Sequence, residues 1–232
     1  MQIGKTLGLA ALLALSASFA QAQDLRIGLQ EDPDVLDPDQ SRTFVGRIVY
    51  ASMCDKLVDI TPELEIIPSL ATGWEWNEEG TVLTMTLRDD VLFHDGTPFN
   101  AEAVAANIDR SKNLETSRRK SEVRSIERWE VVDEFTIQMT LAAPDATLIA
   151  QFADRSGMML SPTAFAESGE EFGLNPVCAG PFAFAERIQQ DRIVLEKFAD
   201  YYRADEISFD SVAFLQIAAS TVRLDTLRAG DL

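Results

Sequence analysis

The chain has 232 residues, and its 38 acidic and 20 basic residues give it a formal net charge of −18 at pH 7. Such a surface repels the phosphates of nucleic acids and of anionic lipids, so neither nucleic acid nor a membrane surface is an expected partner. Hydrophobic residues make up 46% of the sequence. This is enough for a packed core, and the length allows one or two domains.

Residues 1–22 have the pattern of a cleavable secretory signal. Lys5 supplies a positive charge, an apolar run follows over 7–15, and Ala20-Gln21-Ala22 places small residues where a signal peptidase cleaves. The run is much shorter than the ~20 apolar residues that cross a bilayer, so a permanent anchor is the weaker alternative. We therefore expect an exported protein that begins at Gln23.

The next elements are a strand, an acidic loop and a helix. Residues 24–29 alternate between polar and apolar, which predicts a half-buried strand, and the segment EDPDVLDPD is rich in turn formers. Apolar residues then recur at helical spacing with Thr43 as a possible N-cap, which predicts a helix over 43–58.

Short strands are predicted between residues 68 and 99. The turn formers at 77–80 and at Asp95-Gly96 supply the positive-φ residues of tight turns, and His94 stands beside the second turn. Asn100 is a good N-cap for a helix that ends near Asn113.

The rest of the chain predicts a mixed α/β fold with many strands. The expected elements are, in order, strands over 126–132 and 135–141, a helix over 145–154, a short helix from Pro162, a loop over 169–176, a hairpin of strands 182–188 and 192–198, a strand over 209–216, and a helix over 220–229 that Gly230 ends.

Cys54 and Cys178 are the two cysteines of the chain. In an exported protein thiols tend to pair, so a disulfide between them is the favoured interpretation. Two buried free thiols are the alternative. A catalytic cysteine is the least favoured one, because His94 is the chain's one histidine and lies far from both in sequence.

No metal site is expected. Four aspartates of the acidic loop invite comparison with a calcium site, but the loop lacks the Gly and the terminal Glu of an EF-hand, and Asp beside Pro commonly forms turns. His94 has no second histidine to complete a metal site. We expect Trp74 and Trp76 to pack against a core and the basic run 118–120 to be a solvated loop.

Six segments occur in the order and spacing of the family 5 extracellular solute-binding proteins, which the chain therefore resembles. They are LDP at 36–38, CDKLVD at 54–59, PSLATGWEW at 68–76, TLRDDVLFHDGTPFNAEAV at 86–104, CAGPF at 178–182 and LRAGDL at 227–232. That family comprises the peptide, dipeptide and nickel receptors of ATP-binding-cassette (ABC) importers. The chain departs from its pattern at Asp90, where Gly is usual, and at Cys178-Ala179, where Gly-Thr is usual.

The resemblance implies a periplasmic-binding-protein-like type II lobe of the α/β (mixed α+β) class. Its core would comprise residues 23–54 and 178–232, and an α+β subdomain over 55–177 would be inserted between them. Cys54 and Cys178 would then lie at the two ends of the insertion, where a disulfide is plausible. Because family members are about twice as long, we expect this chain to be a fragment that lacks the second lobe.

Two groups of residues are predicted to bind ligand. Open α/β sheets bind ligands beyond the carboxyl ends of their strands, and helix N-termini favour anions. Both arguments, and the resemblance, favour Arg42, Thr43 and Phe44. The turn with Ala179 and Gly180 is a second candidate.

The implied function is that of a monomeric periplasmic receptor. It would bind peptides or related small solutes and deliver them to an inner-membrane ABC permease, without catalysis and without a cofactor. A secreted hydrolase is one alternative, although neither Gly-x-Ser-x-Gly nor His-Glu-x-x-His occurs in the sequence. A periplasmic sensor or chaperone with the same fold is another.

Overall fold

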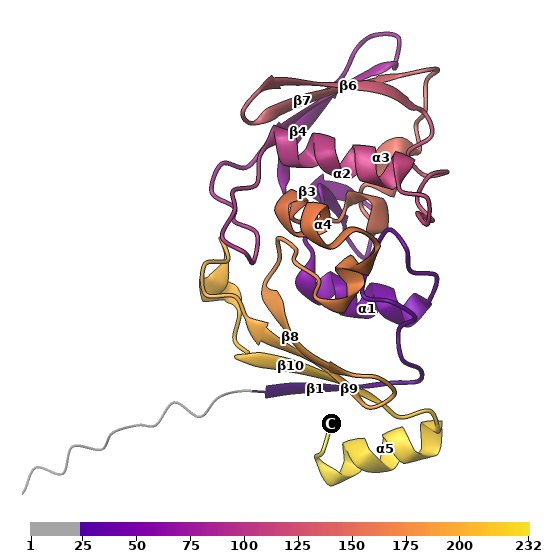
Figure 1. The fold of residues 1–232 in the computed structure, drawn as a ribbon, viewed down its shortest axis with the longest axis vertical. Helices are drawn as coiled ribbons and strands as arrows, with labels where there is room; N and C mark the ends of the chain where they lie inside the picture. Colours follow the sequence, from indigo (N-terminus) through magenta and orange to yellow (C-terminus); the bar gives the residue numbers. More distant parts are fainter. Residues whose placement is uncertain (1–23) are drawn as a thin grey trace, which may run out of the picture.

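The computed structural model describes residues 24–232, so the predicted signal at 1–22 lies outside the described residues. The molecule is elongated, with two four-stranded sheets and most of the helices between them, while the C-terminal helix lies beyond one of the sheets (Figure 1). Within residues 24–232 no helix combines the length and the apolar character that a bilayer crossing requires.

The first sheet joins the beginning and the end of the chain. Its strand order is β1-β10-β9-β8, and β1 pairs in parallel with β10 while the other pairs are antiparallel. The strands are β1 (Asp24–Leu29), β8 (Phe182–Ile188), β9 (Arg192–Lys197) and β10 (Ser211–Gln216). Helix α1 (Phe44–Met53) contributes Val49, Tyr50 and Met53 to the hydrophobic cluster of this sheet, which we call the first core.

The second sheet has the order β4-β5-β7-β6, and all of its pairs are antiparallel. Its strands are β4 (Ala71–Trp76), β5 (Val82–Leu87), β6 (Ile126–Asp133) and β7 (Thr136–Leu141), with helix α2 (Ala101–Asn113) on one face. Alternate residues of β5 and β7 are buried, as the strand period requires. Trp74 and Trp76 pack partly buried against the resulting second core, as predicted.

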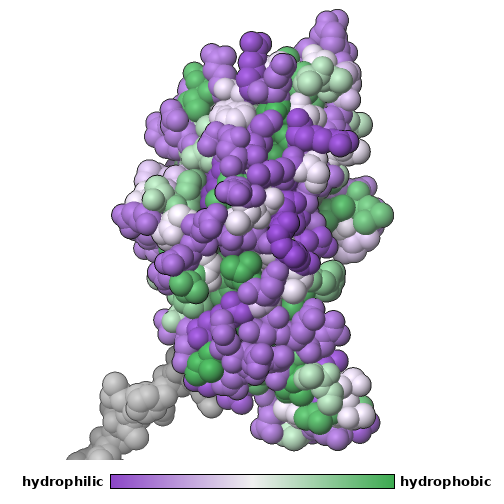
Figure 2. All heavy atoms as spheres, turned by 45° about the vertical axis from the view of Figure 1, so that its right-hand side comes forward, coloured by the Kyte–Doolittle hydropathy of each residue, from purple (hydrophilic) through white to green (hydrophobic). Residues whose placement is uncertain are grey.

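The remaining elements are short, apart from the terminal helix. They are β2 (Val58–Ile60), β3 (Ile66–Pro68), α3 (Leu148–Gln151), α4 (Pro162–Ser168), α5 (Ser220–Ala229) and the 3₁₀ turns η1 (Arg155–Gly157), η2 (Gly169–Leu174) and η3 (Ala204–Glu206). Figure 2 shows a largely hydrophilic face with scattered hydrophobic side chains. Helix α5 exposes Val222, Leu224 and Leu227.

Two predicted helices are longer than those observed. The helix predicted over 43–58 ends at Met53 because the N–H groups of Asp55 and Leu57 donate to the carbonyls of Ala179 and Gly157. The helix predicted over 145–154 is reduced to the four residues of α3, and the loop predicted over 169–176 contains η2.

The two cores meet at the disulfide between Cys54 and Cys178, whose Cα atoms are 4.9 Å apart. This confirms the predicted pairing. Ala179 packs in the second core, directly after Cys178 of the first. Met158 and Phe172, from the predicted insertion, pack in the first core. The domain boundaries at 54/55 and 177/178 stay a prediction.

Candidate ligand-binding site

The candidate site lies where the chain leaves the first sheet. Residues 30–43, which we call the binding loop, connect the carboxyl end of β1 to the first turn of α1 (Figure 1). Because β10 runs parallel to β1, the carboxyl ends of both strands lie at this edge. This is the position at which open α/β sheets bind ligands.

Asp34 shapes the end of the binding loop that leads into α1. Its carboxylate accepts hydrogen bonds from Ser41 Oγ at 2.7 Å, from the Arg42 N–H at 2.9 Å and from Thr43 Oγ1 at 3.2 Å. Partial burial raises the pKa of Asp34, but these hydrogen bonds outweigh burial and lower it below its ordinary value. Asp34 is therefore a stable anion that holds three consecutive residues.

The structure brings Arg42, Thr43 and Phe44 together at the start of α1. Thr43 is the N-cap, and its Oγ1 accepts the Gly46 N–H at 3.3 Å. Arg42 is exposed, and Phe44 is 64% exposed. These three consecutive residues therefore include a charged, a polar and an apolar side chain at the N-terminus of α1.

Three further arginines, Arg155, Arg119 and Arg47, surround the N-terminal end of α1, and the sequence interpretation assigned none of them to the binding site. Arg155 Nη1 donates to the carbonyls of Ser41 and Thr43, both at 3.3 Å, and Arg119 Nη2 donates to Ser41 at 3.3 Å. Arg47 follows one turn into α1. Burial, and then the charges of Arg119 and Arg47, lower the pKa of Arg155.

Two acids partly neutralise these arginines. Arg47 forms an ion pair with Asp154, and Arg119 forms one with Glu122, whose pKa burial raises. Arg42 and Asp34 lie at the same end of the helix, so four arginines stand against three acids, which leaves an excess of one positive charge in a strongly acidic protein. The Nε atoms of Arg47, Arg119 and Arg155 are buried without a hydrogen-bond partner among the described residues. The N-terminal end of α1 is therefore suited to bind an anionic group.

The burial of Arg119 corrects one expectation. The basic run 118–120 was predicted to be a solvated loop, but Arg119 is only 7% exposed because it lies between Glu122 and the binding loop. The contact spans 78 residues of sequence. No local pattern carries a signal for it.

Ala179 and Gly180 do not join this site. They lie at the opposite end of α1, about 15 Å away for a helix of ten residues. Ala179 is buried, and its carbonyl accepts the Asp55 N–H at 2.8 Å. A Cβ atom on Gly180 would lie 2.3 Å from the Met53 carbonyl oxygen. Both residues contribute here to the junction of the two cores, and their role in ligand binding stays a prediction.

His94 belongs to the same junction, although it is distant from Cys178 in sequence. The His94 N–H donates to the Cys178 carbonyl at 2.9 Å, and His94 Nδ1 accepts the Cys178 N–H at 3.3 Å. Nε2 lies 3.1 Å from the Gly180 carbonyl. These partners fit a neutral imidazole with its proton on Nε2. Burial lowers the pKa of His94 to about 4.

The aspartates of the acidic loop form ion pairs and hydrogen bonds within the chain. Asp37 and Asp39 pair with Arg110, and Asp32 pairs with Arg187 at 3.0 Å. Nowhere in residues 24–232 do three or more potential His, Cys, Asp or Glu ligands gather in a way that could hold a metal ion.

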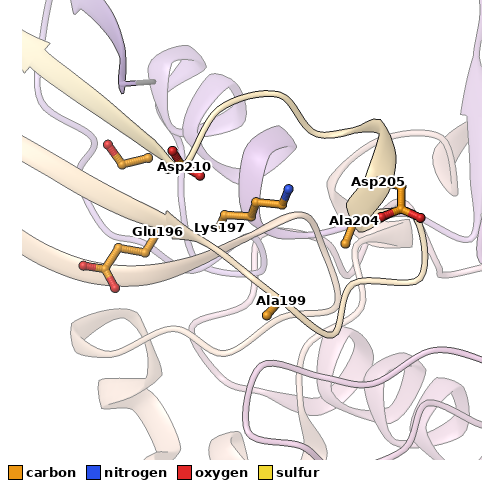
Figure 3. Close-up of a pocket in the computed structure, with 7 residues that line it drawn as sticks. Glu196, Lys197, Ala199, Ala204, Asp205 and Asp210 are labelled. Carbon is orange, nitrogen blue, oxygen red and sulfur yellow. The ribbon is translucent and has the colours of Figure 1, made fainter. Parts of the chain in front are cut away.

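A wide cavity of about 620 Å³ lies at the other edge of the first sheet, where β9 ends and β10 begins (Figure 3). Glu196, Asp205 and Asp210 line it, and Lys197 extends toward the segment that carries Ala204 and Asp205. Lys197 Nζ donates to the Ile207 carbonyl at 2.8 Å, so this lysine already has a partner. The cavity is at the amino end of β10, opposite the binding loop.

Comparison with known proteins shows similarity to bacterial solute-binding proteins. The family model for bacterial extracellular solute-binding proteins, family 5 (middle region), matches residues 65–232. The glutathione-binding protein GsiB of Pectobacterium atrosepticum is 30% identical over 225 residues, which are 97% of this chain and 44% of that protein. GsiB of Escherichia coli K12 is equally similar, at 30% over 226 residues. The chain thus spans less than half the length of these relatives.

Solved structures share the fold. AgaA of A. tumefaciens R10, in complex with agropinic acid, superposes with a TM-score of 0.82 at 28% identity, over 90% of this chain and 43% of AgaA. OppA of Burkholderia pseudomallei superposes with a TM-score of 0.83 over 92% of this chain and 46% of OppA. At 21% identity the second match shows the fold alone.

Proposed function

Because the chain belongs to family 5 of the bacterial extracellular solute-binding proteins, we propose that it forms one half of a receptor that binds peptides or related small solutes. The receptor works as a monomer in the periplasm and delivers its solute to an inner-membrane ABC permease. The binding loop and the start of α1 provide this chain's share of the solute contacts.

The observation that carries the proposal is the positive excess beside the exposed ring of Phe44. Arg47, Arg119 and Arg155 lie around the α1 N-terminus, where the helix dipole also favours an anion. A free carboxylate of a peptide fits this charge, and an apolar side chain fits the Phe44 ring. Glutathione and agropinic acid, which appear in the names of similar proteins, also carry carboxylates.

Hydrolysis is the less supported alternative. The chain's one histidine, His94, is buried at the junction of the cores with both ring nitrogens hydrogen-bonded to backbone groups. Such an imidazole has no free nitrogen to act as a general base. We therefore propose binding without catalysis.

The proposal predicts that recognition depends on the ligand's carboxylate. The dipeptide Ala-Phe should bind residues 24–232 weakly, because this stretch spans less than half the length of its relatives and supplies only part of the contacts of a closed two-lobed receptor. Ala-Phe amide, which lacks the anion, should bind about tenfold more weakly still, since a charge-assisted hydrogen bond is lost. NMR titration measures both dissociation constants.

Arg47→Gln isolates the contact. We expect it to weaken Ala-Phe binding about tenfold and to abolish the difference between the acid and the amide, as two coupled partners require. Arg128→Gln, an exposed arginine on β6, is the matched control and should change neither value. Equal binding of acid and amide by the unaltered protein would contradict carboxylate recognition.

A further inference from the structure

A buried ion-pair network links the binding loop to the second core's helix. Asp37, Asp39 and Arg110 are each less than 10% exposed. Arg110 Nη2 donates to Asp37 Oδ2 at 2.7 Å and Nη1 to Asp37 Oδ1 at 3.2 Å, while Nη1 also donates to Asp39. Ser111, the next residue of α2, donates from Oγ to Asp39 at 2.7 Å. One face of α2 thus holds both aspartates.

Asp37 organises the turn that follows it. Its carbonyl accepts the N–H groups of Gln40 at 3.2 Å and of Ser41 at 2.9 Å, and its Oδ1 accepts the Asp39 N–H at 2.9 Å. Ser41 then donates to Asp34, which fixes Arg42 and Thr43. A continuous chain of hydrogen bonds therefore runs from Arg110 to the N-cap of α1.

The surroundings of Arg110 require the charge and the planar shape of a guanidinium group. Its guanidinium lies 5.3 Å from the centre of the Phe165 ring and 5.2 Å from that of Phe172, so aromatic side chains exclude water around it. A planar fork bonds two carboxylates at once, which a lysine ammonium cannot do in the same geometry. Burial raises the pKa of Asp39, and the charge of Arg110 lowers it. The effect of burial is the larger, so the pKa is raised above its ordinary value.

We propose that Arg110 is a positioning residue of the candidate binding site: it sets the conformation of the binding loop from the second core, through Asp37 and Asp39. The effect of Arg110 on ligand affinity rests on the proposed function, but the effect of Arg110 on the conformation of the binding loop does not. The part of the chain around α2 is then a support of the binding surface.

Amide hydrogen exchange tests the effect on the loop without any ligand. In Arg110→Lys we expect the Gln40 and Ser41 amides to exchange at least about tenfold faster, because the fork that holds Asp37 is lost. Amides of β5 in the second core should be unchanged. Arg124→Lys, at an exposed arginine outside the network, is the control and should leave all of these rates unchanged.

A neutral network separates positioning from stability. The triple variant Asp37→Asn, Asp39→Asn, Arg110→Met leaves no unpaired buried charge, so it should recover the urea midpoint of the unaltered protein. If Arg110 positions the loop, the fast exchange at Gln40 and Ser41 and a roughly tenfold weaker Ala-Phe affinity persist in this variant. If Arg110 only stabilises the fold, the loop exchange rates and the Ala-Phe affinity of the triple variant return to those of the unaltered protein together with its stability.

The outcomes are distinguishable from those of the proposed function. Unaltered loop exchange in folded Arg110→Lys would overturn the positioning role, and if that variant does not fold, slow loop exchange in the triple variant would do so. Absence of any Ala-Phe response in the unaltered protein would refute the proposed function, while the exchange rates would still decide the role of Arg110.

Discussion

Loss of the Cys54–Cys178 disulfide is expected to lower the free energy of unfolding by about 5 kcal/mol. The bond closes a loop with a sequence separation of 124, and in the chain-entropy model a cross-link over such a loop removes about that much free energy from the unfolded ensemble. It also joins the two cores where they meet. Urea unfolding of Cys54→Ala/Cys178→Ala against the oxidised protein measures the difference.

The control for this prediction is the reductant itself. Dithiothreitol should shift the urea midpoint of the unaltered protein and leave that of the double-alanine variant unchanged. Because both cysteines are almost fully buried, reduction should be slow in the absence of urea and fast near the midpoint. If intact-mass analysis after alkylation finds two free thiols in native protein that has met no reductant, the disulfide does not form and the prediction is wrong.

Acidification should cost about 3 kcal/mol of stability through His94 alone. Its pKa is about 4 in the folded protein and 6.5 when unfolded, and each unit of difference corresponds to about 1.4 kcal/mol. The folded-state pKa is the lower one, so the unfolded state binds the proton first. The stabilising contribution of neutral His94 is complete above pH 6.5 and is lost as the pH falls toward 4.

His94→Gln separates this contribution from the titration of carboxylates. Glutamine does not titrate, and its amide keeps a donor near the Gly180 carbonyl. The difference in unfolding free energy between the two proteins should therefore shrink as the pH falls from 7 to 4. A difference that stays constant over this range would show that His94 is not held neutral at the junction.

Features that depend on neighbouring residues could be predicted from the sequence. Asn100 caps α2, with its side chain accepting the Ala103 N–H at 3.0 Å, and Gly230 ends α5 in the left-handed conformation. Gly80 and Gly96 have positive φ in the predicted turns. In each case the determinant lies within a few residues, so the local pattern contains the necessary information.

Features that depend on distant contacts could not be predicted in the same way. The end of α1 at Met53 is set by Ala179 and Gly157, more than 100 residues away. His94 was assigned only to a turn, although its ring bonds the backbone at Cys178 and Gly180. Such pairs have no periodicity or spacing that marks them.

The candidate site shows the same division. The first group, Arg42 to Phe44, was predicted from the end of the first strand, the start of the next helix and the family resemblance, and the structure places these residues at the N-terminus of α1. The surrounding arginines arrive from separate segments, and only the folded chain brings Arg119 and Arg155 to the Ser41 carbonyl. The charge of the site therefore became visible only in the structure.

Where the solute binds can be measured by following the backbone amides of residues 24–232 during an NMR titration with Ala-Phe. We expect the largest chemical-shift changes to cluster at Arg42, Thr43 and Phe44 and to extend to Arg47 on the next turn of α1. Shifts confined to the cavity lined by Glu196, Asp205 and Asp210 at the opposite edge of the sheet, or no shifts at the start of α1, would contradict this expectation.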